Sequence, residues 1–479
     1  MRTRHLVFLS AVLAACSAPN SQDGGTSDTP TSDVASDSVT LDRPTPTDAP
    51  VGMDTPAPTD VVNPTDTPTP TDVPVTMTDT CLGTAATGVY LADPSMCIVQ
   101  FAGSLMRPRG IAFAPNGDLF VNDYGRITAL HDDNGDGNVS TTERNVFATI
   151  RPETGTTPHG IAFSPDGAYL YASTSGTVYR WAYTSGLRMG GAVETVITGI
   201  PVGGSHPTRT LLFDATGRLY VSVGSQGNLD QSASLAMTRA MIRRFTIPAT
   251  IPSGGMAYTT GEVWASGMRN EVGMTFDAMG RFWSVENGRD NTVTAGNVDV
   301  HIRNPAEEIN QVTEAGTHFF GYPSCWSEGV GLTGGGGPGT QHGDVQSSVP
   351  ATRDDAWCQN PANVHPPAGV MPAHWAPLGV TEYQGSTFPS DWNGDLLITS
   401  HGSWNSETGQ VGRLVARAEV AADGTIASVT PILGQAGTGG MLAQGGWNVR
   451  PVDIKIGPDG AIYFSDDQGG RIFRVGYRH

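Results

Sequence analysis

The chain has 479 residues, a formal net charge of −19, 61 glycines, 34 prolines and five cysteines. Proteins that bind nucleic acids neutralise the phosphates with an excess of basic residues. The excess of acidic residues in this chain therefore argues against a nucleic acid partner. The many glycines and the modest share of charged residues suit a fold with many tight turns.

The N-terminus has the pattern of an export signal. Arg2 and Arg4 precede an apolar run, Leu6–Leu13, that is too short to span a bilayer in the mature protein. The run ends in the motif LAAC at Cys16, which resembles a bacterial lipobox, and Ser17 follows it. We therefore expect a lipoprotein signal peptide over residues 1–16, with Cys16 lipidated and anchored to the outer membrane, facing either the periplasm or the cell surface. The alternative is a plain secretory signal in which Cys16 has no role.

Residues 17–79 are dominated by Thr, Pro, Asp and Ser, with eleven aspartates and one arginine, Arg43, and thus a net charge of −10. Such a segment buries too little apolar surface to offset the entropy lost on ordering. We expect a disordered, extended linker, which also carries much of the acidity of the chain.

Residues 80–479 contain six copies of one short unit, each of which has two short strands around a turn with Gly or Asp. The copies are Gly110–Asn122, Gly160–Ser173, Arg209–Val223, Val272–Val285, Gly379–Thr399 and Val452–Ser465. Repeats about 50 residues apart indicate a propeller or a similar array. The sequence predicts an all-β fold, a six-bladed β-propeller in which each copy supplies two of the four strands of a blade.

Two features of the predicted propeller depend on the spacing of the copies. The longest gap predicts an insertion at about residues 290–376. The C-terminal strand Arg471–Tyr477 is expected to share a blade with a strand near Ile98–Ala102, because this closure removes an open sheet edge.

Apart from Cys16, the chain has four cysteines: Cys81, Cys97, Cys325 and Cys358. An even number in an exported protein predicts disulfides. Of the three possible connectivities, the local pairs Cys81–Cys97 and Cys325–Cys358 are favoured. The sequence has no CxxCH motif, so a c-type haem is not expected.

The segment 132–143, DDNGDGNVSTTE, matches the EF-hand loop pattern at positions one, three, five, six and twelve. Alternate acidic side chains on a tight turn, with a bidentate glutamate, supply the oxygens that Ca²⁺ prefers. No helix pair flanks the segment, so it predicts a structural calcium clip between strands. The expected ligands are Asp132, Asn134, Asp136, Asn138 and Glu143. The alternative is a solvated acidic hairpin loop.

Polar residues flank the strand pairs where a propeller carries its functional groups. They are Arg109, His159, His206, Arg269, Asn270, His401, Trp404 and Arg450. Arginines from different blades would form a cationic funnel for a small ligand with several anionic groups. Any one of these residues can equally make a hydrogen bond at a blade edge, but their repetition in several blades favours a shared site.

Six segments in this order resemble the glucose/sorbosone dehydrogenase family. They are HPTRTLLFDATGRLYVSVGSQGN, GMRNEVG, VENGRD, HFFGYPSCW, EYQGSTFPSDWNGDLLITSHGSWN and RPVDIKIGPDGAIYFSDD. The resemblance covers most of residues 105–477 and is closest to the sorbosone and pyranose dehydrogenase branch. It implies a six-bladed quinoprotein that uses pyrroloquinoline quinone (PQQ) and calcium. Such an enzyme oxidises an aldose, pyranose or sorbosone-like sugar at its anomeric or aldehyde carbon. Its electrons pass to an external acceptor, a quinone or a cytochrome.

The resemblance also implies roles for individual residues. His206 matches the general base that takes the proton of the anomeric hydroxyl. Arg269 and Asn270 match residues that hold the quinone oxygens and stabilise negative charge. Gly288 and Arg289 match positions whose backbone carbonyls bind calcium. The cofactor-binding set implied is Arg109, Arg269, Asn270, His401, Trp404 and Arg450, and either Trp404 or Trp447 would stack on the ring system.

The chain also departs from the family pattern. Ser225 stands where the glucose dehydrogenase branch has an acidic residue, but the sorbosone-like branch tends to have Ser there, so this residue favours that branch. Lys455 is the single lysine, so the cofactor anchors are expected to be Arg and His. Two other functions stay open. One is a non-catalytic propeller that displays a protein- or glycan-binding surface. The other is a calcium-dependent lactonase, for which Glu286 and Asp290 are the nearest candidate carboxylates.

Overall fold

The structure is a computed structural model that describes residues 79–83, 85–231, 238–313, 318–347, 353–403, 405–407, 409–443 and 446–479. The predicted signal peptide and the predicted linker up to residue 78 lie outside this part of the chain, so the lipidation of Cys16 stays a prediction. The chain divides between residues 73 and 74 into two units, and the described residues all belong to the second. No helix within the described ranges is long and apolar enough to cross a membrane.

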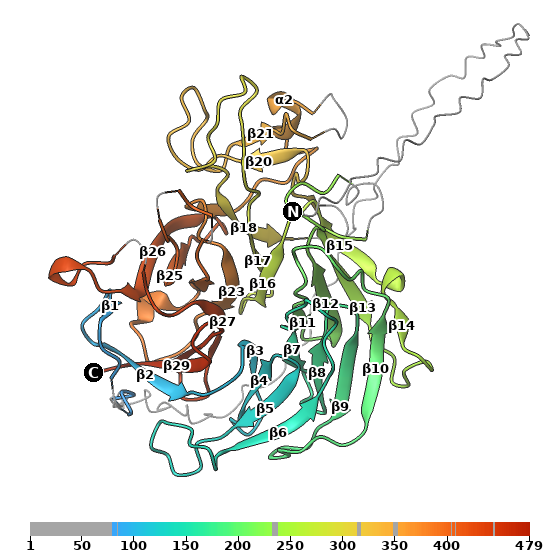
Figure 1. The fold of residues 1–479 in the computed structure, drawn as a ribbon, viewed down its shortest axis with the longest axis vertical. Coiled ribbons are helices and arrows are strands. Elements are labelled where there is room, and N and C mark those ends of the chain that lie inside the picture. The colour runs from blue at the N-terminus through green and yellow to red at the C-terminus, as the bar shows by residue number, and fades with distance from the viewer. Residues whose placement is uncertain are drawn as a thin grey trace, which may run out of the picture. The chain divides into compact units, whose positions relative to one another are not determined.

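In the described part of the chain, six sheets form the propeller of the second unit, and each is built on four antiparallel strands (Figure 1). Blade one has β3 (Pro108–Phe113), β4 (Leu119–Asp123), β5 (Arg126–Leu130) and β6 (Arg144–Thr149). Blade two has β7 (Ile161–Phe163), β8 (Tyr169–Ser173), β9 (Val178–Ala182) and β10 (Val193–Thr198). Blade three has β11 (Leu211–Phe213), β12 (Arg218–Val223), β13 (Met241–Thr246) and β15 (Glu262–Ser266).

The remaining blades have the same plan. Blade four has β16 (Glu271–Phe276), β17 (Phe282–Glu286), β18 (Glu307–Val312) and β22 (Gly369–Met371). Blade five has β23 (Pro377–Glu382), β24 (Leu396–Ser400), β25 (Leu414–Val420) and β26 (Ile426–Gln435). Blade six has β27 (Pro451–Ile456), β28 (Ile462–Asp466), β29 (Arg471–Tyr477) and β2 (Met96–Ala102). The predicted all-β, six-bladed propeller is confirmed.

Short elements complete the sheets and their connections. The strands β1 (Val89–Leu91), β14 (Met256–Ala257) and β19 (His318–Phe319) extend blades five, two and three at their outer edges. Three 3₁₀ turns lie in connections: η1 (Tyr258–Thr260), η2 (Ser390–Trp392) and η3 (Thr438–Gly440).

The last blade closes as the sequence predicts. Strand β29 pairs with β28 on one side and with β2 on the other, in a register that places Ile98 opposite Val475. The N-terminal strand therefore covers the edge that the C-terminal strand would otherwise expose.

Glycine lets the innermost strands approach one another around the channel. Gly110 in β3 and Gly379 in β23 occupy equivalent places in their repeats. A methyl group at Gly110 would clash with the carbonyl of His159 in the next blade, and one at Gly379 would lie 2.6 Å from the carbonyl oxygen of Val452. This repeated close approach brings the loops that precede the inner strands together at one end of the channel.

The interval 290–376, predicted as one insertion, contains the blade-four strands β18 and β22. The chain returns to the sheet twice, so the extra structure is split into the connection 287–306 and the stretch 313–368. The second stretch carries a two-stranded sheet, β20 (Cys325–Ser327) and β21 (Gln341–Gly343), and the short helix α2 (Asp355–Cys358). The disulfide Cys325–Cys358 joins this sheet to α2, and Cys81–Cys97 joins the N-terminal segment to β2, which confirms the predicted pairing.

Candidate functional site

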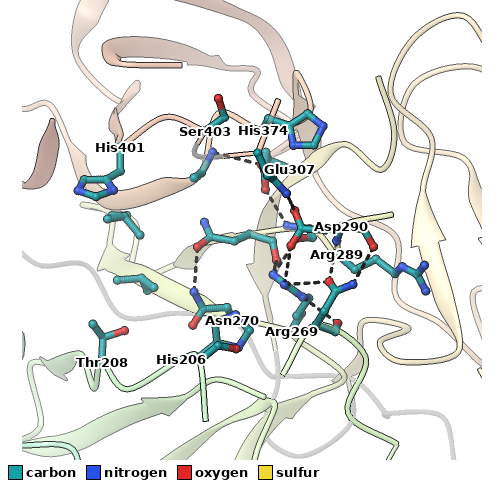
Figure 2. A pocket seen from close by; sticks show the side chains of 18 of the residues that line it. His206, Thr208, Arg269, Asn270, Arg289, Asp290, Glu307, His374, His401 and Ser403 are labelled. Atoms are coloured by element: carbon teal, nitrogen blue, oxygen red, sulfur yellow. Dashed lines mark hydrogen bonds and ion pairs between the residues drawn. The ribbon is translucent and has the colours of Figure 1, made fainter. Parts of the chain in front are cut away.

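A cavity of about 880 Å³ lies where the inner strands begin. Eight residues predicted for the cofactor site line it: Arg109, His206, Arg269, Asn270, Gly288, Arg289, His401 and Arg450 (Figure 2 labels five of them). They come from blades one, three, four, five and six. Trp404 lies outside the described residues. Trp447 is buried against Phe464 between blades five and six and does not line the cavity.

The side chain of His206 is held in one tautomer. Its Nδ1 lies 2.9 Å from the carbonyl oxygen of Ser225 and 3.0 Å from Ser225 Oγ. Because a carbonyl only accepts, Nδ1 carries the proton. Ser225 Oγ donates in turn to the carbonyl of Gly227 at 2.7 Å, so it also accepts from Nδ1. The other ring nitrogen, Nε2, therefore has a free lone pair.

Burial and then the neighbouring charge of Arg269 lower the pKa of His206 to about 3. The imidazole is thus neutral over the whole range in which a sugar oxidation would be assayed. A neutral histidine with Nδ1 held and Nε2 free is the form required of a general base.

Arg269 is fixed by oxygen atoms on three sides. Its Nε donates to the carbonyl of Asn228 at 3.1 Å, its Nη1 to the carbonyl of Gly288 at 2.8 Å, and its Nη2 lies 3.3 Å from the carboxylate of Asp290. Beside it, Asn270 donates from Nδ2 to Asn287 Oδ1 at 2.8 Å. These contacts hold a guanidinium and an amide at the cavity wall, next to His206.

A shared carboxylate, that of Asp467, holds Arg109 and His401 at the cavity. Asp467 accepts from Arg109 Nη1 at 2.6 Å and lies 2.8 Å from His401 Nε2. The guanidinium of Arg450 donates to the carbonyls of His401 and Gly402 at 3.0 and 3.1 Å and forms no ion pair with a carboxylate within the described ranges, while its backbone amide donates to Asp466 Oδ1 at 2.9 Å. Burial lowers the pKa of both Arg109 and Arg450, and Arg109 Nε is buried without a partner among the described residues. These donors suit an anionic ligand.

Two carboxylates that the sequence did not single out as cavity residues shape the cavity wall. Glu307 accepts from the amides of Gly288 at 2.7 Å and Ala376 at 3.1 Å, and burial raises its pKa to about 7. Asp467 is the other. Glu307 and Asp467 could have been found in the sequence as members of two adjacent acidic pairs, Glu307-Glu308 and Asp466-Asp467, each beside an apolar strand.

Asp290 ties three loops together at the cavity. Its carboxylate accepts from Asn405 Nδ2 at 2.5 Å and faces Arg269, while its backbone amide donates to Asn228 Oδ1 at 2.7 Å. The connection after β17 is thereby joined to loops of blades three and five. Because Asp290 is engaged in this way, it is a poor candidate for the metal ligand of a lactonase.

Three carboxyls lie in register behind the cavity. Glu271, Glu286 and Glu308 are cross-strand neighbours on β16, β17 and β18 and all are buried. Burial raises the pKa of each. Glu286 accepts from the amide of Arg269 at 2.6 Å and does not line the cavity, which removes the second lactonase candidate. Carboxyls so close and so buried cannot all ionise, so protons are shared among them.

The backbone carbonyl predicted to bind calcium at Gly288 faces Arg269 Nη1. A carbonyl oxygen has two lone pairs, so this contact leaves one for a cation. Across the described ranges, no group of three or more His, Cys, Asp or Glu side chains is arranged to hold a metal ion. A metal at this wall would therefore take its ligands from carbonyls and from a bound cofactor.

The predicted calcium loop lies between β5 and β6 of blade one and does not line the cavity. Asp132 Oδ2 accepts from the amide of Gly137 at 2.8 Å, Asp136 Oδ1 from that of Asn138 at 2.8 Å, and Glu143 Oε2 from that of Ser140 at 3.0 Å. The carboxylates thus point into the loop and bind its own amides. Calcium binding by this loop stays a prediction.

Known proteins resemble this chain in sequence over most of its length. The TrAA12-like family model matches residues 92–478. A PQQ-dependent sugar dehydrogenase of Hypocrea jecorina is 31% identical over 397 residues, which cover 77% of this chain and 85% of that protein. A PQQ-dependent pyranose dehydrogenase of Coprinopsis cinerea is 29% identical over 412 residues, 79% of this chain but 53% of that protein. The chain thus spans about half the length of the second relative.

Solved structures are also similar to this chain over most of its length. The holo form of the pyranose dehydrogenase PQQ domain from Coprinopsis cinerea has a TM-score of 0.70 and 27% identity, covering 81% of this chain and 97% of that one. A calcium structure of a Trichoderma reesei family AA12 enzyme has a TM-score of 0.70 and 28% identity, covering 83% and 100%. The similarity therefore extends over most of the chain.

Proposed function

Because the chain belongs to the TrAA12-like family, we propose that it is a PQQ- and calcium-dependent dehydrogenase that oxidises a sugar at its anomeric carbon. The observation that carries the proposal is the cavity itself. It brings a neutral histidine with a free Nε2 together with cations from blades one, four and six. A propeller that only displayed a binding surface would have no need for these groups to converge.

The residues present suit the cofactor. PQQ, when bound, supplies an ortho-quinone that accepts two electrons and carries three carboxylates. Arg450, whose guanidinium forms no ion pair in the described part of the chain, and Arg109, with its unpartnered Nε, would bind those carboxylates. His401 is held by Asp467 at the same wall. Arg269 and Asn270 would donate to the quinone oxygens and stabilise the negative charge that develops there.

His206 would take the proton of the anomeric hydroxyl at Nε2. Ser225 keeps the proton of the ring on Nδ1, so the lone pair that accepts is the one not bound to Ser225. Removal of this proton makes the anomeric carbon a better hydride donor. The substrate class is a pyranose or a related aldose, and a quinone or a cytochrome would be the external electron acceptor.

The carbonyls of Gly288 and Arg289 are the proposed calcium ligands. Glu307 holds the amide of Gly288 and so fixes the direction of the neighbouring carbonyls. A second calcium is proposed in the loop 132–143.

For location, we propose an exported lipoprotein that is anchored through Cys16 to the outer membrane. Mass spectrometry of the N-terminal peptide, compared with that of a Cys16→Ser variant, would test this proposal.

Reconstitution tests the proposed function. The purified protein is titrated with PQQ in calcium by calorimetry, and then assayed with a panel of sugars and an artificial acceptor dye. We expect PQQ to bind, a sugar to be oxidised, and a chelator to abolish both effects. A protein that binds no PQQ in calcium is not this dehydrogenase, and the display propeller would then be the better interpretation.

A further inference from the structure

Arg209 is a buried cation that contacts no carboxylate in the described part of the chain. Its side chain is 1% exposed and is among the largest that are fully buried. It donates only to carbonyls: from Nε to Ser175 at 3.0 Å, from Nη1 to His206 at 3.0 Å and to Thr208 at 2.5 Å, and from Nη2 to Pro201 at 2.5 Å. Burial of a charge without an opposite charge beside it is costly, so this residue needs an explanation.

Arg239 repeats the arrangement at the carbonyls of Val202, Gly203 and Gly224. It is 6% exposed and donates from Nη2 to the carbonyls of Val202 and Gly203 at 2.7 and 3.1 Å, and from Nη1 to that of Gly224 at 3.4 Å. No carboxylate of the described residues lies within ion-pair distance, although the charge of Asp230 reaches it through space.

The two guanidiniums bind the backbone on both sides of the hydrogen bond between His206 and Ser225. Arg209 binds the backbone carbonyl of His206 itself. Arg239 binds the carbonyl of Gly224, whose chain neighbour Ser225 fixes Nδ1 of the imidazole. The segment 201–208 is tied to both arginines, so the position of the imidazole depends on these contacts.

The charges that face His206 all have one sign. They are Arg209 from its own segment, Arg239 from the connection before β13, and Arg269 from the connection before β16. No carboxylate within the described ranges forms an ion pair with His206. Three positive charges disfavour the imidazolium and so favour the neutral base.

We propose that Arg209 and Arg239 are positioning residues for His206, which fix its backbone and that of Gly224 and add two positive charges to the surroundings of the imidazole. This inference rests on the proposed function, because it gives His206 the role of base. The competing explanation is that the two arginines only join loops and contribute stability.

The first experiment does not depend on activity. Histidine labelled with ¹³C is incorporated into the cofactor-free protein, and the ring signals are followed from pH 8 to pH 4. A His206→Asn variant assigns the His206 signal. We expect this signal not to titrate in the wild type. In Arg209→Gln the His206 pKa should rise by about one unit, so that titration begins within the range. Arg209→Lys retains the charge and should leave the signal unchanged.

Arg474→Gln is the matched control. Arg474 is also a buried arginine, 2% exposed, but it lies in blade six and pairs with Asp459 at 2.7 Å. Its loss should lower the melting temperature without any change in the His206 signal. If Arg209→Gln does not fold, Arg239→Gln makes the same test.

The second experiment separates position from charge in the PQQ-loaded enzyme. Arg209→Lys cannot reach all four carbonyls, and we expect kcat to fall by about 10–100-fold with the acid limb of the pH profile unmoved. Arg209→Gln should lower kcat and also move the acid limb to higher pH. The inference is overturned if the Arg209 variants lower the melting temperature but leave the His206 titration and the acid limb as in the wild type. A wild type that oxidises no sugar refutes the proposed function alone, because the histidine titration still decides whether the arginines set the state of the imidazole.

Discussion

Replacement of Arg450 by alanine should weaken the binding of PQQ and leave the chemical step intact. Arg450 lines the cavity, its pKa is lowered by burial, and its Nε and Nη2 donate to the carbonyls of His401 and Gly402. A buried hydrogen bond to a charged group contributes about 1.5–3 kcal/mol. With about 1.4 kcal/mol for each tenfold change, the dissociation constant of PQQ should rise by about 10–150-fold.

Calorimetry with PQQ in saturating calcium measures this change, and kcat is then determined at saturating PQQ, where it should recover. Arg417→Ala is a matched control, because Arg417 pairs with Asp395 at 2.5 Å in blade five and does not line the cavity. An unchanged dissociation constant would remove Arg450 from the cofactor site. A kcat that stays low at saturating PQQ would show instead that the residue acts in catalysis.

The other predictions concern the base, the calcium loop and the buried carboxyls. His206→Asn should lower kcat by about 10²–10⁴-fold with little change in PQQ affinity, because it removes a general base; activity close to the wild type would exclude that role. Glu143→Ala should lower the melting temperature more in calcium than in chelator, where only the hydrogen bond from the Ser140 amide is lost, and identical melting curves in saturating calcium would argue against the clip. Burial raises the pKa of Glu271 to about 8, so the folded state holds more protons than the unfolded state above pH 4.5 and stability should fall as the pH rises toward 8. Glu271→Gln should reduce this fall in melting temperature, and a pH dependence equal to that of the wild type would contradict the assignment.

The fold was predictable because its determinants are local and repeated. Each copy shows two short apolar runs around a turn, and four of the six have a glycine before the first run, where the close packing of inner strands leaves little room for a side chain. The closing strand was also predictable, because a propeller leaves no edge uncovered. The division of the insertion into its parts was not predictable. The strand β22 has only three residues, and neither EEINQV of β18 nor GVM of β22 has a repeat partner that would mark it as a blade strand.

The cavity was predictable only in part. Residues that precede inner strands, such as Arg109 and Arg450, could be grouped because every blade presents the same position to the channel. Their partners could not be deduced, because Asp467 follows a strand of blade six and pairs with Arg109 across 358 residues of chain. The pKa of His206 depends in the same way on charges from separate segments, Arg239 and Arg269, whose proximity only the folded chain establishes.

Ser225 shows why a difference between two branches of a family carries chemical information. A carboxylate at this position would face Nδ1 of His206 and favour the imidazolium, which has no lone pair for the sugar hydroxyl. A serine holds the same nitrogen by accepting its hydrogen bond, without a negative charge, and donates its own proton to the carbonyl of Gly227. The base then stays neutral among arginines, and the positive charge of the cavity remains available for an anionic cofactor. The neutral partner of the histidine and the excess of cations around it therefore act together. Both keep the imidazole uncharged and the cavity positive.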